Sequence, residues 1–117
     1  MSITIYHNPR CSKSRNSLAL LVEAGVEPTI IEYLHAPPDA NTILRLADLL
    51  GIPVSGLLRR GESAFKEAED LPNLDDDAAL ARWLESHPIV IERPIVVNDA
   101  GNKAVIGRPP ENVLELT

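Results

Sequence analysis

The spacing of apolar and polar residues predicts that the chain begins with a strand, a helix and a second strand. Apolar and polar residues alternate over residues 2–6, which is typical of a short strand, and His7-Asn8-Pro9 then predicts a turn. A helix is predicted to begin at Cys11 and to end at Gly25, and the β-branched run Thr29–Tyr33 predicts a second strand. The apolar stripe of this helix consists of Leu18, Leu21 and Val22. The first third of the chain therefore forms a βαβ unit.

The middle of the chain, about residues 38–87, is predicted to be an all-helical insertion. Its helices are marked by an Asp39 cap with a Gly51 end, by residues 55–60, and by an Asp75 or Asp76 cap with a His87-Pro88 end. Trp83 falls in the apolar stripe of the last of these helices, so we expect it in the core. The segment from Glu62 to Asp77 holds seven acids and one lysine, which predicts solvated surface.

The end of the chain predicts two strands and a helix. Pro94–Val97 and Lys103–Ile106 are strand-like, and the turn-rich residues 98–102 between them predict a hairpin with a five-residue loop. A last helix is expected to begin near Pro109-Pro110. The order βαβ, helical insertion, ββα places the chain in the α/β class, and its 117 residues suffice for a single domain spanning residues 1–117.

Composition narrows the class of protein further. No apolar run approaches the roughly 20 residues of a membrane span, and the N-terminus lacks the order of a signal peptide, so we expect a soluble protein with no membrane partner. A net charge of -6 argues against nucleic acid as a partner. The single cysteine excludes an internal disulfide framework and indicates a reducing compartment, most simply the cytoplasm.

Charge is distributed unevenly around Cys11. Residues 1–22 contain no acid, whereas Arg10, Lys13 and Arg15 surround the only thiol. A helix N-terminus and nearby cations both favour thiolate over thiol, which predicts a reactive nucleophile beside a pocket for a small anion. The alternatives are chance clustering of cations on a solvated helix start and a buried, inert cysteine.

Other candidate site residues are less specific by spacing alone. Eight of the eleven basic residues are arginines, whose planar forks suit oxyanions, and both Arg93 and Arg108 precede a proline at the end of an element. Arg59 and Arg60 end a predicted short helix; any of these arginines could equally be ordinary surface residues. His7 could orient the thiol or cap the turn. The histidines lack partners at ligand spacing, so no metal site is predicted.

One stretch of sequence resembles a known active site. Residues 5–16, Ile-Tyr-His-Asn-Pro-Arg-Cys-Ser-Lys-Ser-Arg-Asn, resemble the opening of the ArsC-type, glutaredoxin-dependent arsenate reductases, with their pattern Y-H-N-P-x-C-x-x-S-R-N. Further matches follow in the family's order: residues 27–34 with Pro37-Pro38, Leu57-Leu58-Arg59, His87-Pro88-Ile89, Arg93–Val97 and Arg108-Pro109. The resemblance covers essentially the whole chain.

The resemblance implies a fold and a set of roles. The fold would be thioredoxin-like (glutaredoxin-like) with a helical insertion. Cys11 would be the nucleophile, and the oxyanion would be held by Arg59, Arg93 and Arg108, with Arg60 outside the pattern. Pro94 would be the cis proline that such folds set opposite the cysteine. His7 and Ser14 would support the thiolate.

The activity implied by the resemblance is the reduction of arsenate to arsenite. Glutathione would be the reducing co-substrate and glutaredoxin the protein partner, with no bound cofactor. The chain ends soon after the last predicted helix, and in this it resembles the short ArsC-like subgroup. Two other functions remain open: a monothiol glutaredoxin-like reductase, which fits Cys11-x-x-Ser14, and an Spx-type regulator of RNA polymerase. The usual Cys-x-x-Cys switch of that regulator is absent because Ser14 replaces the second cysteine.

Overall fold

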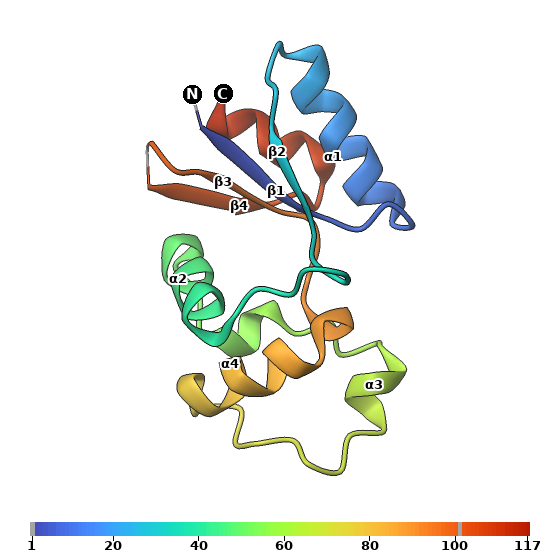
Figure 1. Ribbon diagram of the computed structural model, residues 1–117, viewed down its shortest axis with the longest axis vertical. Coiled ribbons are helices and arrows are strands. Elements are labelled where there is room, and N and C mark those ends of the chain that lie inside the picture. Colours follow the sequence, from blue (N-terminus) through green and yellow to red (C-terminus); the bar gives the residue numbers. More distant parts are fainter. Residues whose placement is uncertain (1, 101) are drawn as a thin grey trace. The chain divides into compact units, whose positions relative to one another are not determined.

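The computed structural model describes residues 2–100 and 102–117 and confirms the predicted order of elements (Figure 1). The chain forms two compact units. One, the sheet unit, runs to Ala36 and resumes at Arg93; the other, the helical unit, spans Pro37–Glu92. The sheet unit contains β1 (Ile3–His7), α1 (Ser12–Glu23), β2 (Thr29–Glu32), β3 (Ile95–Asn98), β4 (Lys103–Ile106) and the 3₁₀ helix η3 (Pro110–Leu116).

The four strands form one mixed sheet in the order β2-β1-β3-β4. β1 runs parallel to β2, with His7 opposite Glu32, and antiparallel to β3, with Ile5 opposite Val96. β3 and β4 are antiparallel, so that Ile95 pairs with Ile106. The central strands are mostly buried, whereas the edge strand β2 is mostly exposed. The carboxyl ends of the parallel strands β1 and β2 therefore meet at one edge of the sheet.

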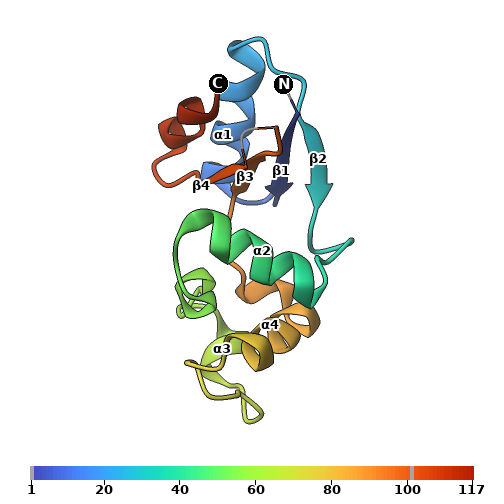
Figure 2. The same ribbon diagram turned by 90° about the vertical axis from the view of Figure 1, so that its left-hand side faces the viewer.

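The core of the sheet unit lies between the sheet and the helices α1 and η3, which pack against each other (Figure 2). Its buried members are Ile3, Ile5, Leu21, Val96, Val113 and Leu116. Val22 was predicted to belong to the apolar stripe of α1, but this is wrong, because its side chain is 59% exposed. One residue turns a helix by about 100°, and the buried face of α1 is instead formed by Ser14, Ser17 and Leu21. Because two of these three buried residues are serines, the pattern of apolar residues alone did not identify this face.

The last segments differ from the predictions in detail. The final helix is present but has 3₁₀ geometry over Pro110–Leu116. β3 begins one residue later than predicted and includes Asn98, which shortens the predicted five-residue loop. That loop contains Gly101, which lies outside the described residues. The Arg93–Pro94 peptide bond is cis, as the resemblance implied, and so is the Arg108–Pro109 bond.

The helical unit is built on α2 (Ala40–Leu50) and α4 (Asp77–Ser86), which pack together. The Asp39 cap is confirmed, because its side chain accepts a hydrogen bond from the Thr42 N–H at 2.8 Å. Of the two residues predicted for the second cap, Asp76 takes the role and accepts a hydrogen bond from the Ala79 N–H at 3.1 Å. Gly51 ends α2 with a φ of 70°, a conformation that glycine adopts without strain. Trp83 is buried, as predicted, and its ring stacks on His87.

The shorter helices of this unit are η1 (Val54–Leu57), α3 (Ser63–Lys66) and η2 (Pro88–Val90). The predicted helix over residues 55–60 is therefore a 3₁₀ turn that stops at Leu57, because Leu58 instead forms a β-bridge with Ile91. The Arg59 N–H donates to the Val90 carbonyl at 2.7 Å, which ties η2 to the same unit. No described helix is long and apolar enough to cross a membrane.

Candidate functional site

Cys11 stands in the turn between β1 and α1 and is the N-cap residue of α1. Its backbone is extended (φ -95°, ψ 122°), as N-cap residues usually are, and its N–H donates to the Asn8 carbonyl at 3.0 Å. The helix then starts with the Arg15 N–H donating to the Cys11 carbonyl. The side chain is partly exposed. The predicted position of the thiol at a helix N-terminus is thus confirmed.

The thiol is held in an environment that lowers its pKa. Burial acts in the opposite direction and raises the pKa, but the backbone N–H groups of Ser14 and Lys13, in the first turn of α1, lower it. The charge of Arg108 and a hydrogen bond from the Arg93 side chain lower it further, and the net shift is downward. Free N–H groups in the first turn of a helix favour a negative charge at this point. The site therefore favours the thiolate more than water does.

Arg93 and Arg108 reach the thiol together because of the strand register. Ile95 pairs with Ile106, so positions 93 and 108, each two residues beyond the paired ends, face each other. The Arg108 Nε–H donates to the Arg93 carbonyl at 2.8 Å, and the other end of the same guanidinium lies 3.6 Å from the Cys11 sulfur. Arg93 itself is only 7% exposed. Two cationic forks thus converge on one sulfur atom.

Gly107 allows this approach of the chain to α1. A Cβ atom added to Gly107 would lie 2.7 Å from Pro94 Cγ and would also meet the Ser17 hydroxyl. Any larger residue would force β4 away from α1 and from the loop that carries Arg93. The close packing of glycine, serine and proline therefore sets the position of Arg108 beside Cys11.

His7 and Ser14 hold the turn before Cys11 by hydrogen bonds to each other and to the backbone. Both are buried, and the Ser14 hydroxyl lies 2.7 Å from His7 Nδ1 and accepts a hydrogen bond from the Asn8 N–H at 3.0 Å. The pKa of His7 is lowered, mainly by burial, while Glu32 opposes the shift and Arg15 adds to it. Nδ1 of a neutral His7 can then accept a hydrogen bond from the Ser14 hydroxyl. His7 and Ser14 together fix the turn. The backbone N–H of Ser14 also lowers the pKa of the thiol.

Residues 6–116 match the ArsC family. The chain belongs to the ArsC family. It is 47% identical to the Escherichia coli protein named "Uncharacterized protein YfgD", over 97% of this chain and 95% of that protein. It is 45% identical to the arsenate reductase of Haemophilus influenzae, over 99% of both chains. The solved structure titled "Arsenate reductase from Vibrio cholerae" matches with a TM-score of 0.88 and 43% identity, over 100% of this chain and 98% of that one. The thioredoxin-like α/β fold is confirmed by this match.

Arg59, the third arginine that the ArsC resemblance assigns to the oxyanion, lies in the helical unit. Its guanidinium lies 3.1 Å from a Glu92 carboxylate oxygen and 3.4 Å from one of Glu62. Arg60 lies over the ring of Phe65, at 5.9 Å from the ring centre. The role of Arg59 in holding an oxyanion stays a prediction.

Sequence reasoning missed the contribution of Asn8. It is buried, its carbonyl accepts the Cys11 N–H, and its side-chain oxygen accepts the Arg10 N–H at 3.0 Å. The sequence could have indicated this role, because asparagine side chains often accept a hydrogen bond from the backbone N–H two residues later and so stabilise a turn. Asn8 thus shapes the loop that presents Cys11.

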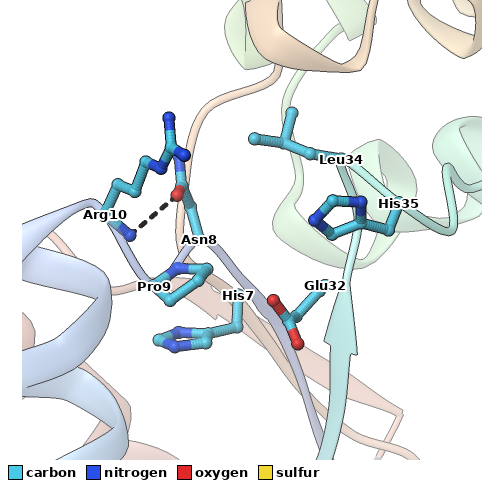
Figure 3. Close-up of a pocket in the computed structure, with 7 residues that line it drawn as sticks. All are labelled: His7, Asn8, Pro9, Arg10, Glu32, Leu34 and His35. Atoms are coloured by element: carbon cyan, nitrogen blue, oxygen red, sulfur yellow. Dashed lines mark hydrogen bonds between the residues drawn. The ribbon is translucent and has the colours of Figure 1, made fainter.

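A cavity of about 200 Å³ adjoins this loop (Figure 3). It is lined by His7, Asn8, Pro9, Arg10, Glu32, Leu34 and His35. Of these residues, only His7 and Arg10 were expected from the sequence to act on the thiol. Across residues 2–100 and 102–117, no cluster of three or more histidine, cysteine or acidic side chains could hold a metal ion.

The lowered pKa of Cys11 leads to a prediction about reactivity. The rate of alkylation by iodoacetamide, followed against pH, should rise with a midpoint below the ordinary cysteine value of about 8.5. Because the folded pKa is depressed, the thiolate should persist as the pH falls below that value and be protonated only below the folded pKa. The same titration of urea-unfolded protein provides the control. An unshifted midpoint in the folded protein would contradict an activated nucleophile.

Ser14→Ala should mainly reduce stability. Removing the hydroxyl leaves His7 Nδ1 and the Asn8 N–H buried without this partner, which should lower the free energy of unfolding by about 2 kcal/mol. The backbone N–H of Ser14, which lowers the pKa of Cys11, remains, so that pKa should move little. Urea denaturation and thiol titration measure the two effects. Ser12→Ala, at an exposed position in the same turn, is the matched control. A large rise in the Cys11 pKa without loss of stability would show that the hydroxyl itself acts on the thiolate.

Proposed function

We propose that this ArsC protein is a glutaredoxin-dependent arsenate reductase that uses Cys11 as its nucleophile. The observation that carries the proposal is the position of the Arg108 guanidinium, which lies 3.6 Å from the Cys11 sulfur. The Nε–H of the same guanidinium donates to the Arg93 carbonyl, and the pKa of the thiol is lowered. Its relatives in Haemophilus influenzae and Vibrio cholerae are named arsenate reductases. A thiolate flanked by guanidinium forks suits a tetrahedral oxyanion.

In the first step the Cys11 thiolate attacks the arsenic atom of arsenate. A sulfur–arsenic bond forms and one oxygen leaves as water after protonation, while arsenic remains As(V). Arg93 and Arg108 donate N–H groups to the arsenate oxygens and offset the repulsion between two anions. We assign the same task to Arg59 from the resemblance. The site thus provides the nucleophile and the positive charge that the step requires.

In the second step a glutathione thiolate attacks the Cys11 sulfur. A sulfur–sulfur bond forms, the sulfur–arsenic bond breaks, and its electron pair leaves with arsenic, which becomes As(III) in arsenite. The two sulfurs are oxidised together to the mixed disulfide of Cys11 and glutathione, so one electron pair passes to one arsenic. A glutaredoxin thiol then takes the glutathionyl group and restores Cys11. Such a relay operates in a reducing compartment, which we take to be the cytoplasm.

The test is the formation of arsenite from arsenate by the purified protein with glutathione, glutaredoxin and a source of NADPH. The wild-type protein should turn over, and Cys11→Ser should reduce turnover to background. Reduction of a glutathione mixed disulfide without any arsenite formation would instead favour a monothiol glutaredoxin-like enzyme. Binding to RNA polymerase without either activity would favour a regulator of the Spx type.

A further inference from the structure

The cavity beside the Cys11 loop opens at the carboxyl ends of β1 and β2. His7 and Glu32 are the last residues of these parallel strands and pair with each other in register. The loops that follow each strand supply the other lining residues, among them Arg10 and Leu34. In α/β sheets, the carboxyl ends of parallel strands are a common place for ligands to bind. At about 200 Å³, the cavity is sized for part of a small molecule.

The cavity carries opposite charges at two points. Arg10 supplies a guanidinium and Glu32 a carboxylate, and both residues are exposed and able to meet a ligand (Figure 3). Within the part of the chain that the structure describes, no ion pair or side-chain hydrogen bond engages either charged group. Leu34 adds an apolar contact. A ligand that presents a carboxylate and an ammonium on one carbon atom would match this pair of charges, whereas a simple anion would face repulsion from Glu32.

We propose that this cavity binds the γ-glutamyl end of glutathione, with the α-carboxylate toward Arg10 and the α-ammonium toward Glu32. The inference rests on the proposed function, in which glutathione attacks the Cys11 adduct. Arg10 immediately precedes Cys11, so their Cα atoms are about 3.8 Å apart. The glutathione sulfur and its γ-glutamyl α-carbon are separated by several bonds, which leaves room for the sulfur to face Cys11. The glycine end bears only a carboxylate and cannot use Glu32.

The first experiment varies the thiol donor and the charges of the cavity. The donors are glutathione, γ-glutamylcysteine and cysteinylglycine, and the variants are Arg10→Gln and Glu32→Gln. Arg82→Gln and Glu23→Gln, at exposed helix positions that do not line the cavity, are the matched controls. We expect the variants to raise KM for glutathione and γ-glutamylcysteine about fivefold and to leave KM for cysteinylglycine unchanged. Any general effect on Cys11 would alter all three donors equally.

Equal changes for all donors, or no change, would overturn the assignment. So would a rise in KM for arsenate alone in Arg10→Gln, because it would identify the cavity as part of the oxyanion site. The donor comparison is therefore specific to the γ-glutamyl group.

A second experiment separates this inference from the proposed function. S-methylglutathione, which cannot react, is titrated calorimetrically into Cys11→Ser protein with and without Glu32→Gln. Binding that Glu32→Gln weakens supports the cavity assignment even if wild-type protein reduces no arsenate. Arsenate reduction by glutathione without any effect of Glu32→Gln on S-methylglutathione binding would overturn the cavity assignment and leave the proposed function standing. Absence of binding to Cys11→Ser protein would overturn the assignment in either case.

Discussion

Arg108→Lys is expected to lower kcat/KM for arsenate about 100-fold, the usual effect of losing one donor to a developing oxyanion. The guanidinium spans two partners, with Nε on the Arg93 carbonyl and the far nitrogen 3.6 Å from the Cys11 sulfur. A lysine ammonium keeps the charge, but a single nitrogen cannot occupy both positions. Stability should fall by only about 1 kcal/mol, for the one lost hydrogen bond. Steady-state kinetics and urea denaturation of the same preparations measure the two quantities.

Arg82→Lys is the matched control for this substitution, because Arg82 is an exposed arginine on α4 and should tolerate lysine with unchanged kinetics. The pKa of Cys11 provides a further readout, and it should rise little in Arg108→Lys because the positive charge is retained. Near-normal arsenate kinetics in Arg108→Lys would mean that the bidentate geometry is not used, and the oxyanion assignment would have to be abandoned.

Local signals in the sequence located the ends of the helices well. The carboxylates of Asp39 and Asp76 accept hydrogen bonds from the first turns of α2 and α4, and Gly25 and Gly51 have the positive φ angles of helix C-termini. These features depend on neighbouring residues only, so a single sequence is enough to find them. The same holds for the position of Cys11 at the start of α1. The proposed nucleophile could therefore be placed at a helix N-terminus from the sequence alone.

Features that depend on distant pairing could not be found in this way. Arg93 and Arg108 meet because Ile95 pairs with Ile106, and no local pattern specifies that register. Glu32 joins the cavity because β2 lies parallel to β1 with Glu32 opposite His7. In the sequence, nothing distinguishes Glu32 from other acidic residues at the end of a predicted strand. Tertiary pairing, rather than residue type, gives these side chains their neighbours.

Turnover is expected to require an outside thiol and to stop when glutathione is omitted. Reduction of arsenate to arsenite consumes one electron pair, which two thiols supply by forming one disulfide. The chain has a single cysteine, so Cys11 provides only one of the two sulfurs. A donor that normally reduces a protein disulfide, such as thioredoxin, finds no such bond here. NADPH consumption with arsenate should be measured with glutathione, its reductase and glutaredoxin, and separately with thioredoxin and its reductase.

The control for this prediction is a variant that carries its own second thiol. Ser14→Cys creates a Cys-x-x-Cys pair, although it also removes the hydroxyl bound to His7, so its stability must be measured first. If that variant folds, it should gain some turnover with thioredoxin, because Cys11 could then form an internal disulfide that thioredoxin can reduce. The wild-type chain should show none. Wild-type turnover with thioredoxin alone, with glutathione rigorously absent, would overturn the glutathione relay even if the protein reduces arsenate, because the second sulfur would then come directly from thioredoxin.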